Sequence, residues 1–499
     1  MKASKLLIWA ETSVAIGTGH VMRCLALAQA WKRAGGAATF LLQEGSSGVA
    51  ERIVAEGFSL ETVREQDLSR AFVRDSGCEL VVLDGYGIGS SEQAALRAAG
   101  VAVLFLDDYG HADHYSARWV LNQNPYAQPG MYAKRDGDTR LLLGPAYALL
   151  RKEFLPWIGW TRTIADRATK ILVTMGGSDA GNASTRILGS LVCLGRRDLE
   201  VVVAVGGGNP HQAALQRAIE QSPVRIRMMQ NVRDMPALMA WADIAIAAAG
   251  GTSYELCYMG LPSILLVAAD NQRGVAESLA SLGAAADAGA MQEFKPEAFV
   301  GLLCALLESS AQRKGMSQKG RELVDGMGAE RVRAALVGRE LRLRPLREND
   351  CQLLFEWAND LAARAASFHP APISWEEHTV WFAERVRDPQ SVVYIGENET
   401  GTAVGQVRFQ LRGESALLSV SVAPQFRGGG WGRELVTFAT RSLAREHPVS
   451  SIDALVKPDN EASIRLFEKS GFQRAGMERI ADQEALRFTW GCKVEAHAS

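Results

Sequence analysis

Residues 419–446 read SVSVAPQFRGGGWGRELVTFATRSLARE, which we interpret as a strand, a glycine-rich turn and a helix. Arg427, Gly430 and Gly432 in the turn fit the pattern R-x-x-G-x-G. Glycines at these positions let backbone N–H groups approach a pyrophosphate closely, and the start of the next helix adds partial positive charge. Because a tight turn without a ligand would have the same glycines, the pattern needs support from its surroundings.

The sequence after this turn gives that support. Residues 452–476, IDALVKPDNEASIRLFEKSGFQRAG, predict a strand, a turn containing Asn460, a short helix and a Gly-Phe pair. In this order the segments resemble the GNAT acetyltransferase superfamily, and the resemblance covers the C-terminal region, residues 341–499. It implies an α+β domain that transfers an acetyl group from acetyl-coenzyme A to an amine. The residues that the resemblance assigns to acetyl-coenzyme A binding are Val420, Val422, Gln425, Arg427, Gly428, Gly429, Gly430, Trp431, Gly432 and Asn460.

One residue departs from the superfamily's pattern. Acetyl transfer needs a neutral amine and protonation of the departing thiolate. Many members of the superfamily have a tyrosine for the second role, in the helix after the Asn turn. The matching position here is Phe467, which has no proton to give, so water or another side chain must serve. Glu356 and His378 are candidate bases, although each also fits an ordinary surface or packing role.

Two further blocks precede this region. In the first, apolar runs such as KLLIWAE alternate with helix-length segments, and the second restarts with KILVTMGGSD. Continuous apolar strands alternating with helices are typical of parallel sheets covered on both faces, and ligands bind beyond the carboxyl ends of such strands. We expect Rossmann-like domains over residues 1–155 and 165–335 that face each other across a cleft, followed by the domain over residues 341–499.

The first predicted strand is followed by glycines and a histidine. In the segment IGTGHVMRCLALA, Gly17 and Gly19 end the strand and His20 starts the helix. The glycines permit a tight turn near a ligand, and a helix start suits an anion. An imidazole titrates near neutral pH, so His20 is a candidate base for deprotonating water. A capping or structural histidine fits the same spacing.

The second block offers a complementary half-site. In AAGGTSYELCYMGLPSILL, a helix that could receive a diphosphate is opened by Gly250, Gly251, Thr252 and Ser253. Glu255, in its first turn, can accept two hydrogen bonds from a ribose diol. A carboxylate there also simply stabilises the helix.

Taken together, the motifs of both blocks resemble GT-B nucleotide-sugar enzymes, the broad group of the MurG glycosyltransferase. The closer resemblance is to the UDP-sugar hydrolases of pseudaminic acid biosynthesis. The segments that carry it, in order, are GTGH, LDGYGI, FLDDYG, LNQNPYA, LLLGPAYALLRKEF, MGGSD, GGTSYE and ADNQ. The implied fold class is α/β, a GT-B-like pair of Rossmann-type domains followed by the GNAT domain.

The same resemblance implies roles for individual residues. His20 would activate water for attack at the anomeric carbon, releasing UDP with inversion. Tyr86 would line the sugar pocket, and Asn182, Glu255 and Asn271 would contact the nucleotide-sugar. Helix dipoles and backbone donors can stabilise a leaving diphosphate, so no metal is expected.

Composition excludes several classes of function. The formal net charge of −2 gives no overall electrostatic case for nucleic acid or anionic membranes as partners. The seven cysteines form no CxxC pair, which argues against structural zinc and a disulfide framework. His111 and His114 in HADH could suggest a metal, but no clear third ligand accompanies them. We find no signal peptide and no apolar stretch long enough to span a membrane, so we expect a cytoplasmic protein.

The two resemblances share a nucleotide-sugar theme. We therefore predict that the C-terminal domain acetylates the 4-amino group of a UDP-linked 4-amino-4,6-dideoxy-sugar, and that the N-terminal pair then hydrolyses UDP from UDP-2,4-diacetamido-2,4,6-trideoxy-β-L-altropyranose. Two alternatives stay open: a GT-B glycosyltransferase with an accessory acetyltransferase, and a non-catalytic UDP-sugar-binding module fused to an acetyltransferase. The exact sugar rests on the resemblance alone.

Overall fold

The structure is a computed structural model that describes residues 5–11, 18–43, 47–63, 78–480 and 482–491. The chain divides into two compact units. Unit 1 comprises residues 1–155 and 161–333, and unit 2 comprises residues 156–160 and 334–499.

The first half of unit 1 is a seven-stranded parallel sheet, in the order β3-β2-β1-β4-β5-β6-β7. Its strands are β1 (Lys5–Ala10), β2 (Ala37–Gln43), β3 (Ser59–Val63), β4 (Leu80–Asp84), β5 (Ala102–Leu106), β6 (Trp119–Asn122) and β7 (Arg140–Leu143). Its α-helices are α1 (Gly19–Arg33), α2 (Ser47–Ala55) and α4 (Ser90–Ala98), and 3-10 turns follow at Pro129–Tyr132, Pro145–Tyr147 and Lys152–Trp157.

The second half of unit 1 is a six-stranded parallel sheet, in the order β10-β9-β8-β11-β12-β13. Its strands are β8 (Lys170–Thr174), β9 (Glu200–Val205), β10 (Arg225–Gln230), β11 (Ile244–Ala248), β12 (Ser263–Val267) and β13 (Ala286–Ala290). Its helices are α5 (Ala183–Cys193), α6 (Gln212–Glu220), α7 (Met235–Trp241), α8 (Thr252–Tyr258), α9 (Arg273–Ser281), α10 (Pro296–Glu308), α11 (Ser310–Leu323) and α12 (Gly328–Leu336), the last of which runs into unit 2, with 3-10 turns at Asp270–Gln272 and Met291–Glu293.

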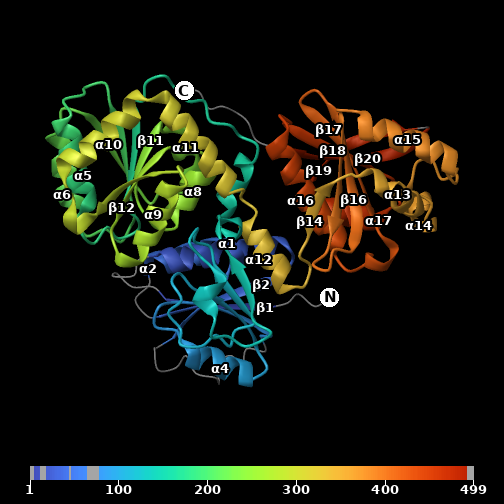
Figure 1. Cartoon of the computed structure of the whole chain (residues 1–499), viewed down its shortest axis with the longest axis horizontal. Coiled ribbons are helices and arrows are strands. Elements are labelled where there is room, and N and C mark those ends of the chain that lie inside the picture. Colours follow the sequence, from blue (N-terminus) through green and yellow to red (C-terminus); the bar gives the residue numbers. More distant parts are fainter. Residues whose placement is uncertain (1–4, 12–17, 44–46, 64–77, 481, 492–499) are drawn as a thin grey trace. The chain divides into compact units, whose positions relative to one another are not determined.

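Burial explains why these segments read as continuous apolar runs. All five residues of β4, β11 and β12 are buried, because helices cover both faces of each sheet (Figure 1). Helix α1 has an uninterrupted buried run from Cys24 to Trp31, and it ends just before Gly35, whose φ of +87° suits glycine.

Both sheets of unit 1 reverse their strand order at one point, between β1 and β4 in the first and between β8 and β11 in the second. In open parallel sheets, loops on the two sides of such a point diverge and leave a crevice for ligands. The predicted motifs GTGH, LDGYGI, MGGSD and GGTSYE all follow these four strands.

Unit 2 is built on a seven-stranded mixed sheet in the order β14-β15-β16-β17-β18-β20-β19. Its strands are β14 (Arg342–Pro345), β15 (Ser391–Glu397), β16 (Ala403–Arg412), β17 (Ser415–Val422), β18 (Ser451–Val456), β19 (Gln473–Ile480) and β20 (Gln483–Gly491). Its helices are α13 (Cys351–Ala358), α14 (Leu361–Ala366), α15 (Trp375–Arg387), α16 (Trp431–Glu446) and α17 (Glu461–Lys469), with 3-10 turns at Glu348–Asp350 and Pro424–Phe426. Strands β17 and β18 are parallel, and the other neighbours are antiparallel.

The predicted fold class is confirmed: two Rossmann-type parallel-sheet halves are followed by a mixed-sheet α+β region. The sequence did not single out β3, β6, β7 or β13. Strands β6 and β7 have only four residues each, and β13 reads ADAGA, which has little strand propensity. The boundaries 1–155, 165–335 and 341–499 stay a proposal.

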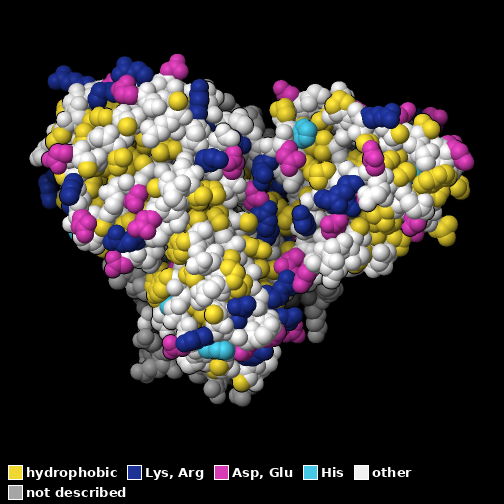
Figure 2. Space-filling model, viewed as in Figure 1, with side chains coloured by type: hydrophobic (Ala, Val, Ile, Leu, Met, Phe, Trp, Pro, Cys, Tyr) yellow, Lys and Arg dark blue, Asp and Glu magenta, His cyan; other side chains and the backbone are white. Residues whose placement is uncertain are grey.

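Surface charge fits the composition. On the face that Figure 2 shows, Lys and Arg side chains are interspersed with Asp and Glu side chains over each unit. Within the described residues, no helix is both long and apolar enough to cross a bilayer.

Candidate active sites

The candidate site of unit 1 lies at the strand-order reversal of its first sheet. Gly19 and His20 open α1 after β1, while Asp84 ends β4 and Tyr86 follows it. His20 is only 5% exposed, and its Nδ1 lies 3.7 Å from Oδ1 of Asp84. The Tyr86 ring meets the His20 ring edge-on, with centroids 4.6 Å apart. The sheet edge at which the strand pattern predicts ligand binding therefore contains an imidazole beside a carboxylate.

The environment of His20 favours its neutral form. Burial lowers the pKa of His20, and this effect outweighs the nearby Asp84 carboxylate, which raises it. Nδ1 is buried and accepts or donates no hydrogen bond within the described part of the chain. A neutral imidazole can take a proton from water, which is the property that a general base requires.

Arg23 holds the carboxylates of this site in place. It lies three residues after His20 on α1 and binds Asp84 with two hydrogen bonds, from Nε at 2.7 Å and from Nη2 at 2.6 Å. Its Nη1 donates to Oδ1 of Asp108 at 2.7 Å. Burial raises the pKa of Asp108, but the Arg23 guanidinium outweighs it and brings the pKa to about 2. Both carboxylates are thus bound to a fixed buried cation.

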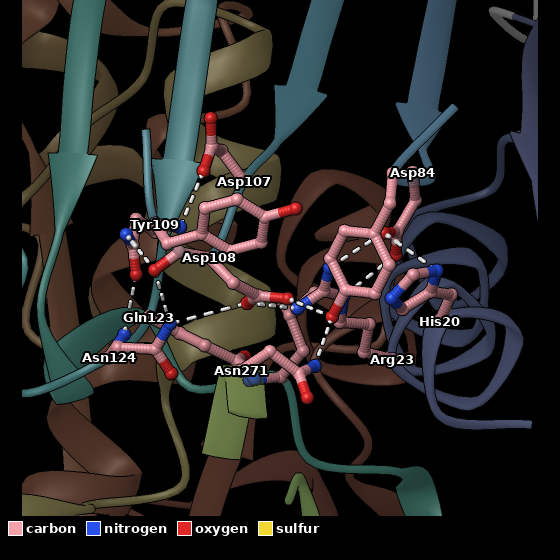
Figure 3. A network of polar contacts seen from close by, with 12 residues as sticks. His20, Arg23, Asp84, Asp107, Asp108, Tyr109, Gln123, Asn124 and Asn271 are labelled. Atoms are coloured by element: carbon pink, nitrogen blue, oxygen red, sulfur yellow. Dashed lines mark hydrogen bonds and ion pairs between the residues drawn. The ribbon is translucent and has the colours of Figure 1, made fainter. Parts of the chain in front are cut away.

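Side chains from the second half of unit 1 also take part in this hydrogen-bond network. Asn271 donates from Nδ2 to the Tyr86 hydroxyl at 2.5 Å, and that hydroxyl donates to Oδ2 of Asp108 at 3.0 Å (Figure 3). Tyr254 of α8 donates to Oδ1 of Asn124 at 2.5 Å. The two parallel-sheet halves therefore meet through hydrogen-bonded side chains at the predicted site.

The structure brings together only some of the predicted residues. His20, Tyr86 and Asn271 lie in one network, whereas Oδ1 of Asn182 accepts a hydrogen bond from Thr185 at the start of α5. Oε1 of Glu255 receives two hydrogen bonds from Arg151, at 2.7 and 3.1 Å. A ribose diol would have to share this carboxylate with a guanidinium.

The glycine-rich turn of the second half has the predicted position. Gly250 and Gly251 lie in the turn between β11 and α8, and Thr252 and Ser253 are the first two residues of α8. Ser253 is 1% exposed, and its Oγ has no hydrogen-bond partner among the described residues. Gly17 lies outside the described residues.

Sequence reasoning missed several residues of this network: Arg23, Asp84, Asp108, Asn124 and Tyr254. A signal existed for the two aspartates, because each follows a predicted apolar strand and so lies at the ligand-binding edge. Arg23 shares a helix face with His20 by its spacing of three residues. Nothing in the sequence pointed to Tyr254, because its partner Asn124 is 130 residues away.

The two histidines of HADH have separate partners. Nε2 of His111 lies 3.0 Å from the carbonyl oxygen of Ile88, and Nδ1 lies 3.5 Å from Asp107. His114 contacts Asp136 at 2.8 Å. Among the residues that the structure describes, no group of three metal-ligating side chains occurs.

The candidate site of unit 2 is the turn after β17. Gly428 and Gly430 have φ of +72° and +88°, a region that side chains rarely adopt. Helix α16 begins at Trp431, and a Cβ on Gly432 would lie 3.2 Å from the Val422 side chain. The first N–H groups of a helix have no intrahelical partner. The turn and helix start therefore present backbone donors that fit a pyrophosphate.

The strands beside this turn separate near Val420 and Val422, two residues that the resemblance assigns to acetyl-coenzyme A binding. β17 pairs with β18 only as far as Leu418 opposite Ala454, although β17 continues to Val422 along β16. The edge of β17 that carries Val420 and Val422 is therefore not paired with β18. An unpaired strand edge offers N–H and C=O groups to an amide-containing ligand.

Other predicted coenzyme residues are engaged within the protein. The Arg427 side chain donates from Nη1 to Asp360 at 2.5 Å and from Nε to the carbonyl oxygen of Val422 at 3.0 Å. Oδ1 of Asn460 accepts from the Ser463 N–H and caps α17. Gln425 is exposed in the 3-10 turn before the glycines, and Gly429 lies between the two left-handed glycines.

The residues considered for proton transfer are packed or exposed. Phe467 is 3% exposed and stacks on Phe488, with centroids 5.9 Å apart. His378 is 2% exposed among aromatic rings, and its Nε2 lies 2.9 Å from the carbonyl oxygen of Cys351. Glu356 is exposed and accepts a hydrogen bond from Gln352.

Comparisons with known proteins match the two units separately. Residues 170–327 match the glycosyltransferase family 28 C-terminal domain, and residues 340–473 match the acetyltransferase (GNAT) domain. An uncharacterized protein of Methanocaldococcus jannaschii is 22% identical over 94% of this chain and 97% of its own length. A spore coat polysaccharide biosynthesis protein of Bacillus subtilis is 27% identical over 66% of this chain and 96% of its own.

A third relative is named as an enzyme. The UDP-2,4-diacetamido-2,4,6-trideoxy-β-L-altropyranose hydrolase of Campylobacter jejuni is 25% identical over 56% of this chain and 97% of its own length. The GNAT match implies acetyl-coenzyme A as a co-substrate, and the turn of unit 2 fits it. The chain thus joins a region similar to the glycosyltransferase family 28 C-terminal domain to a C-terminal region similar to the GNAT acetyltransferase domain.

Proposed function

We propose that the chain catalyses two consecutive steps of pseudaminic acid biosynthesis. Unit 2 acetylates the 4-amino group of a UDP-4-amino-4,6-dideoxy-sugar, and unit 1 hydrolyses UDP from UDP-2,4-diacetamido-2,4,6-trideoxy-β-L-altropyranose. The observation that carries the proposal is the buried His20, whose pKa is lowered by burial, beside Asp84 and close to the Tyr86 side chain that Asn271 of the second half contacts. The named hydrolase from Campylobacter jejuni supports the substrate.

In the hydrolytic step, His20 accepts a proton from water as the water oxygen bonds to the anomeric carbon. The bond between that carbon and the diphosphate oxygen breaks, so UDP leaves with the electron pair and the sugar inverts. Asp84 stabilises the imidazolium that forms, since its charge lies 3.7 Å away. Helix starts after β8 and β11 supply donors for the diphosphate.

In the acetylation step, the neutral amine attacks the thioester carbonyl, and the departing thiolate takes a proton. Phe467 cannot supply that proton, and His378 is packed among aromatic rings. Water reaching the unpaired edge of β17 serves as the acid in this proposal. Water likewise accepts the proton that the attacking amine loses.

The test offers the whole protein a UDP-4-amino-sugar with and without acetyl-coenzyme A. Mass spectrometry and proton NMR follow N-acetylation and the release of UDP. We expect acetylation first and UDP release only from the acetylated sugar. Acetylation without any UDP release would contradict the hydrolytic step, and tight UDP-sugar binding without turnover would show a binding module.

A second candidate function for unit 1 is glycosyl transfer, favoured by the match of residues 170–327 to a glycosyltransferase domain. In that case an added sugar or lipid acceptor would receive the sugar faster than water does. A competition assay with candidate acceptors, scored by mass spectrometry, separates the two reactions.

A further inference from the structure

Arg408 is a half-buried cation without a counter-charge. It lies on β16, and its guanidinium carbon is 5.2 Å from the ring centroid of Trp381 in α15. Within the described part of the chain, no hydrogen bond or ion pair reaches its side chain. Burial lowers the pKa of Arg408, and the neighbouring Arg385 lowers it further. An arginine stays charged even so, which leaves five donors facing an environment that disfavours the charge.

The side chains around Arg408 lie on one face of the sheet. Val407 and Phe409 are buried on the opposite face, where Leu435 of α16 packs against Gly405. The alternation of a strand therefore places Arg408 on the face of α15, as its contact with Trp381 shows.

Gln406 lies on the same face, and its Oε1 is buried without a hydrogen-bond partner among the described residues. An orphaned buried acceptor costs about 1–3 kcal/mol unless something donates to it. Arg408 and Gln406 thus place a cation without a counter-charge beside a buried acceptor without a donor. A buried polar atom without a partner needs an explanation, and a ligand that binds both groups would supply one.

This face adjoins the place where the two parallel strands separate. Ser419 on β17 lies opposite Arg408, and Ser421 lies opposite Gln406. Leu418, just before Ser419, is the last β17 residue paired with β18. The two side chains therefore lie one strand away from the β17 edge that we assign to acetyl-coenzyme A, on the face of the sheet away from α16.

We propose that Arg408 and Gln406 form the acceptor subsite of the acetyltransferase unit. Arg408 binds the diphosphate of a nucleotide-linked amine, and Oε1 of Gln406 accepts a hydrogen bond from a hydroxyl or N–H of the same molecule. This inference rests on the proposed acetylation of a UDP-linked amine. It adds that the unit selects its amine by the attached phosphate and not by the amino group alone.

The experiment compares two amines with the full chain: the UDP-4-amino-sugar and its methyl glycoside, which lacks the diphosphate. Release of the coenzyme A thiol gives initial acetylation rates. Arg408→Gln should raise the KM for the UDP-linked amine roughly 10- to 100-fold, because it removes charge-assisted hydrogen bonds. The kcat, the KM for acetyl-coenzyme A and the KM for the methyl glycoside should each change less than about twofold.

Arg412→Gln is the matched control, since it removes an exposed arginine from the same strand. It should leave every constant unchanged. Arg408→Lys keeps the charge but loses the planar guanidinium, which can donate two parallel hydrogen bonds. Its KM for the UDP-linked amine should therefore fall between those of the unchanged chain and Arg408→Gln.

A melting experiment separates binding from structure. Arg408→Gln should change the melting temperature by only a few degrees at most, because the half-buried arginine has no counter-charge and the substitution removes only its contact with the Trp381 ring. A larger fall in the melting temperature, or equal effects on both amines, would overturn the subsite and leave the acetyltransferase function standing. If the unchanged chain acetylates neither amine, the proposed acetylation itself is wrong.

Discussion

The candidate site of unit 1 is assembled from side chains that are far apart in the sequence, whereas the proposed coenzyme site of unit 2 is mostly backbone from one continuous segment. In unit 1, Arg23 reaches carboxylates that are 61 and 85 residues away. In unit 2, the strand edge, the glycines and the helix start all fall within residues 420–432. The first site therefore depends on particular side-chain groups, and the second on the conformation of a short stretch of backbone.

The difference predicts where each unit is vulnerable. Removing one side chain should disable the unit 1 site, because its polar groups are buried and depend on one another. In unit 2, removing a side chain should matter less than adding one where only glycine fits.

The largest effect is expected from His20→Ala. UDP release should fall by roughly 10²- to 10⁴-fold, since a general base contributes that much, while acetylation should be unchanged. Coupled assays for UDP and for the coenzyme A thiol measure both steps on one sample. His114→Ala, at an exposed histidine of the same half, should change neither rate. Loss of both activities in His20→Ala would indicate misfolding.

Substitutions of two arginines, one in each unit, should lower the stability of the two units by different amounts. Arg23→Met leaves two buried carboxylates without their cation and should lower the free energy of unfolding of unit 1 by about 3–5 kcal/mol. Arg427→Met removes a partly exposed ion pair with Asp360 and should cost unit 2 at most about 1 kcal/mol. Hydrogen-exchange mass spectrometry in denaturant reports each unit separately. Equal losses would show that the two sites are not built differently.

Gly430→Glu tests the backbone site. The new side chain must adopt a φ of +88° and places a carboxylate beside the proposed pyrophosphate position, so the KM for acetyl-coenzyme A should rise at least about tenfold. UDP release from an already acetylated UDP-sugar should be unaffected.

Gly413→Glu is the control for Gly430→Glu. Gly413 has a φ of +61° in the turn between β16 and β17, so the backbone strain is similar, but its surroundings are open, whereas a Cβ on Gly430 would lie 3.0 Å from the Arg339 guanidinium. An equal rise in KM would refute the assignment of the turn at Gly430 to the coenzyme.

A smaller effect is expected from Tyr86→Phe. Its hydroxyl connects Asp108 to Asn271, and losing these hydrogen bonds should cost about 1 kcal/mol, or roughly fivefold in kcat/KM for UDP release. Tyr109→Phe, at an exposed neighbouring ring, should be neutral. Identical kinetics for Tyr86→Phe and the unchanged chain would show that the contact between the halves does not contribute to catalysis.

The smallest effect concerns pH. Because burial lowers the pKa of His20 below its ordinary value of about 6.5, at least half of the base stays neutral at pH 6.5. The rate of UDP release should therefore fall less than about twofold between pH 7.5 and 6.5, and more steeply at lower pH. The same shift makes His20 stabilise the fold above pH 6.5, a contribution lost as the pH falls through the lowered pKa. A half-maximal rate above pH 7 would contradict this environment for His20.

The sequence predicted the elements around both sites better than the contacts inside them. The glycine turn near Gly430 and the helix start at His20 were predictable, because glycines and strand-to-helix transitions leave local signals. The ion pair of Glu255 with Arg151 and the packing of His378 were not, because each depends on a partner from a distant segment.

By itself the sequence determined the fold class, the order of the domains and the segments that form each site, since apolar periodicity and glycine positions are properties of neighbouring residues. Only the tertiary structure decided that Arg23 binds Asp84 and Asp108, that Asn271 meets Tyr86, and that Arg408 has no counter-charge. The order of the strands in a sheet decides which loops lie side by side, and burial decides which charged groups need an oppositely charged partner. Neither is encoded in any single stretch of the chain.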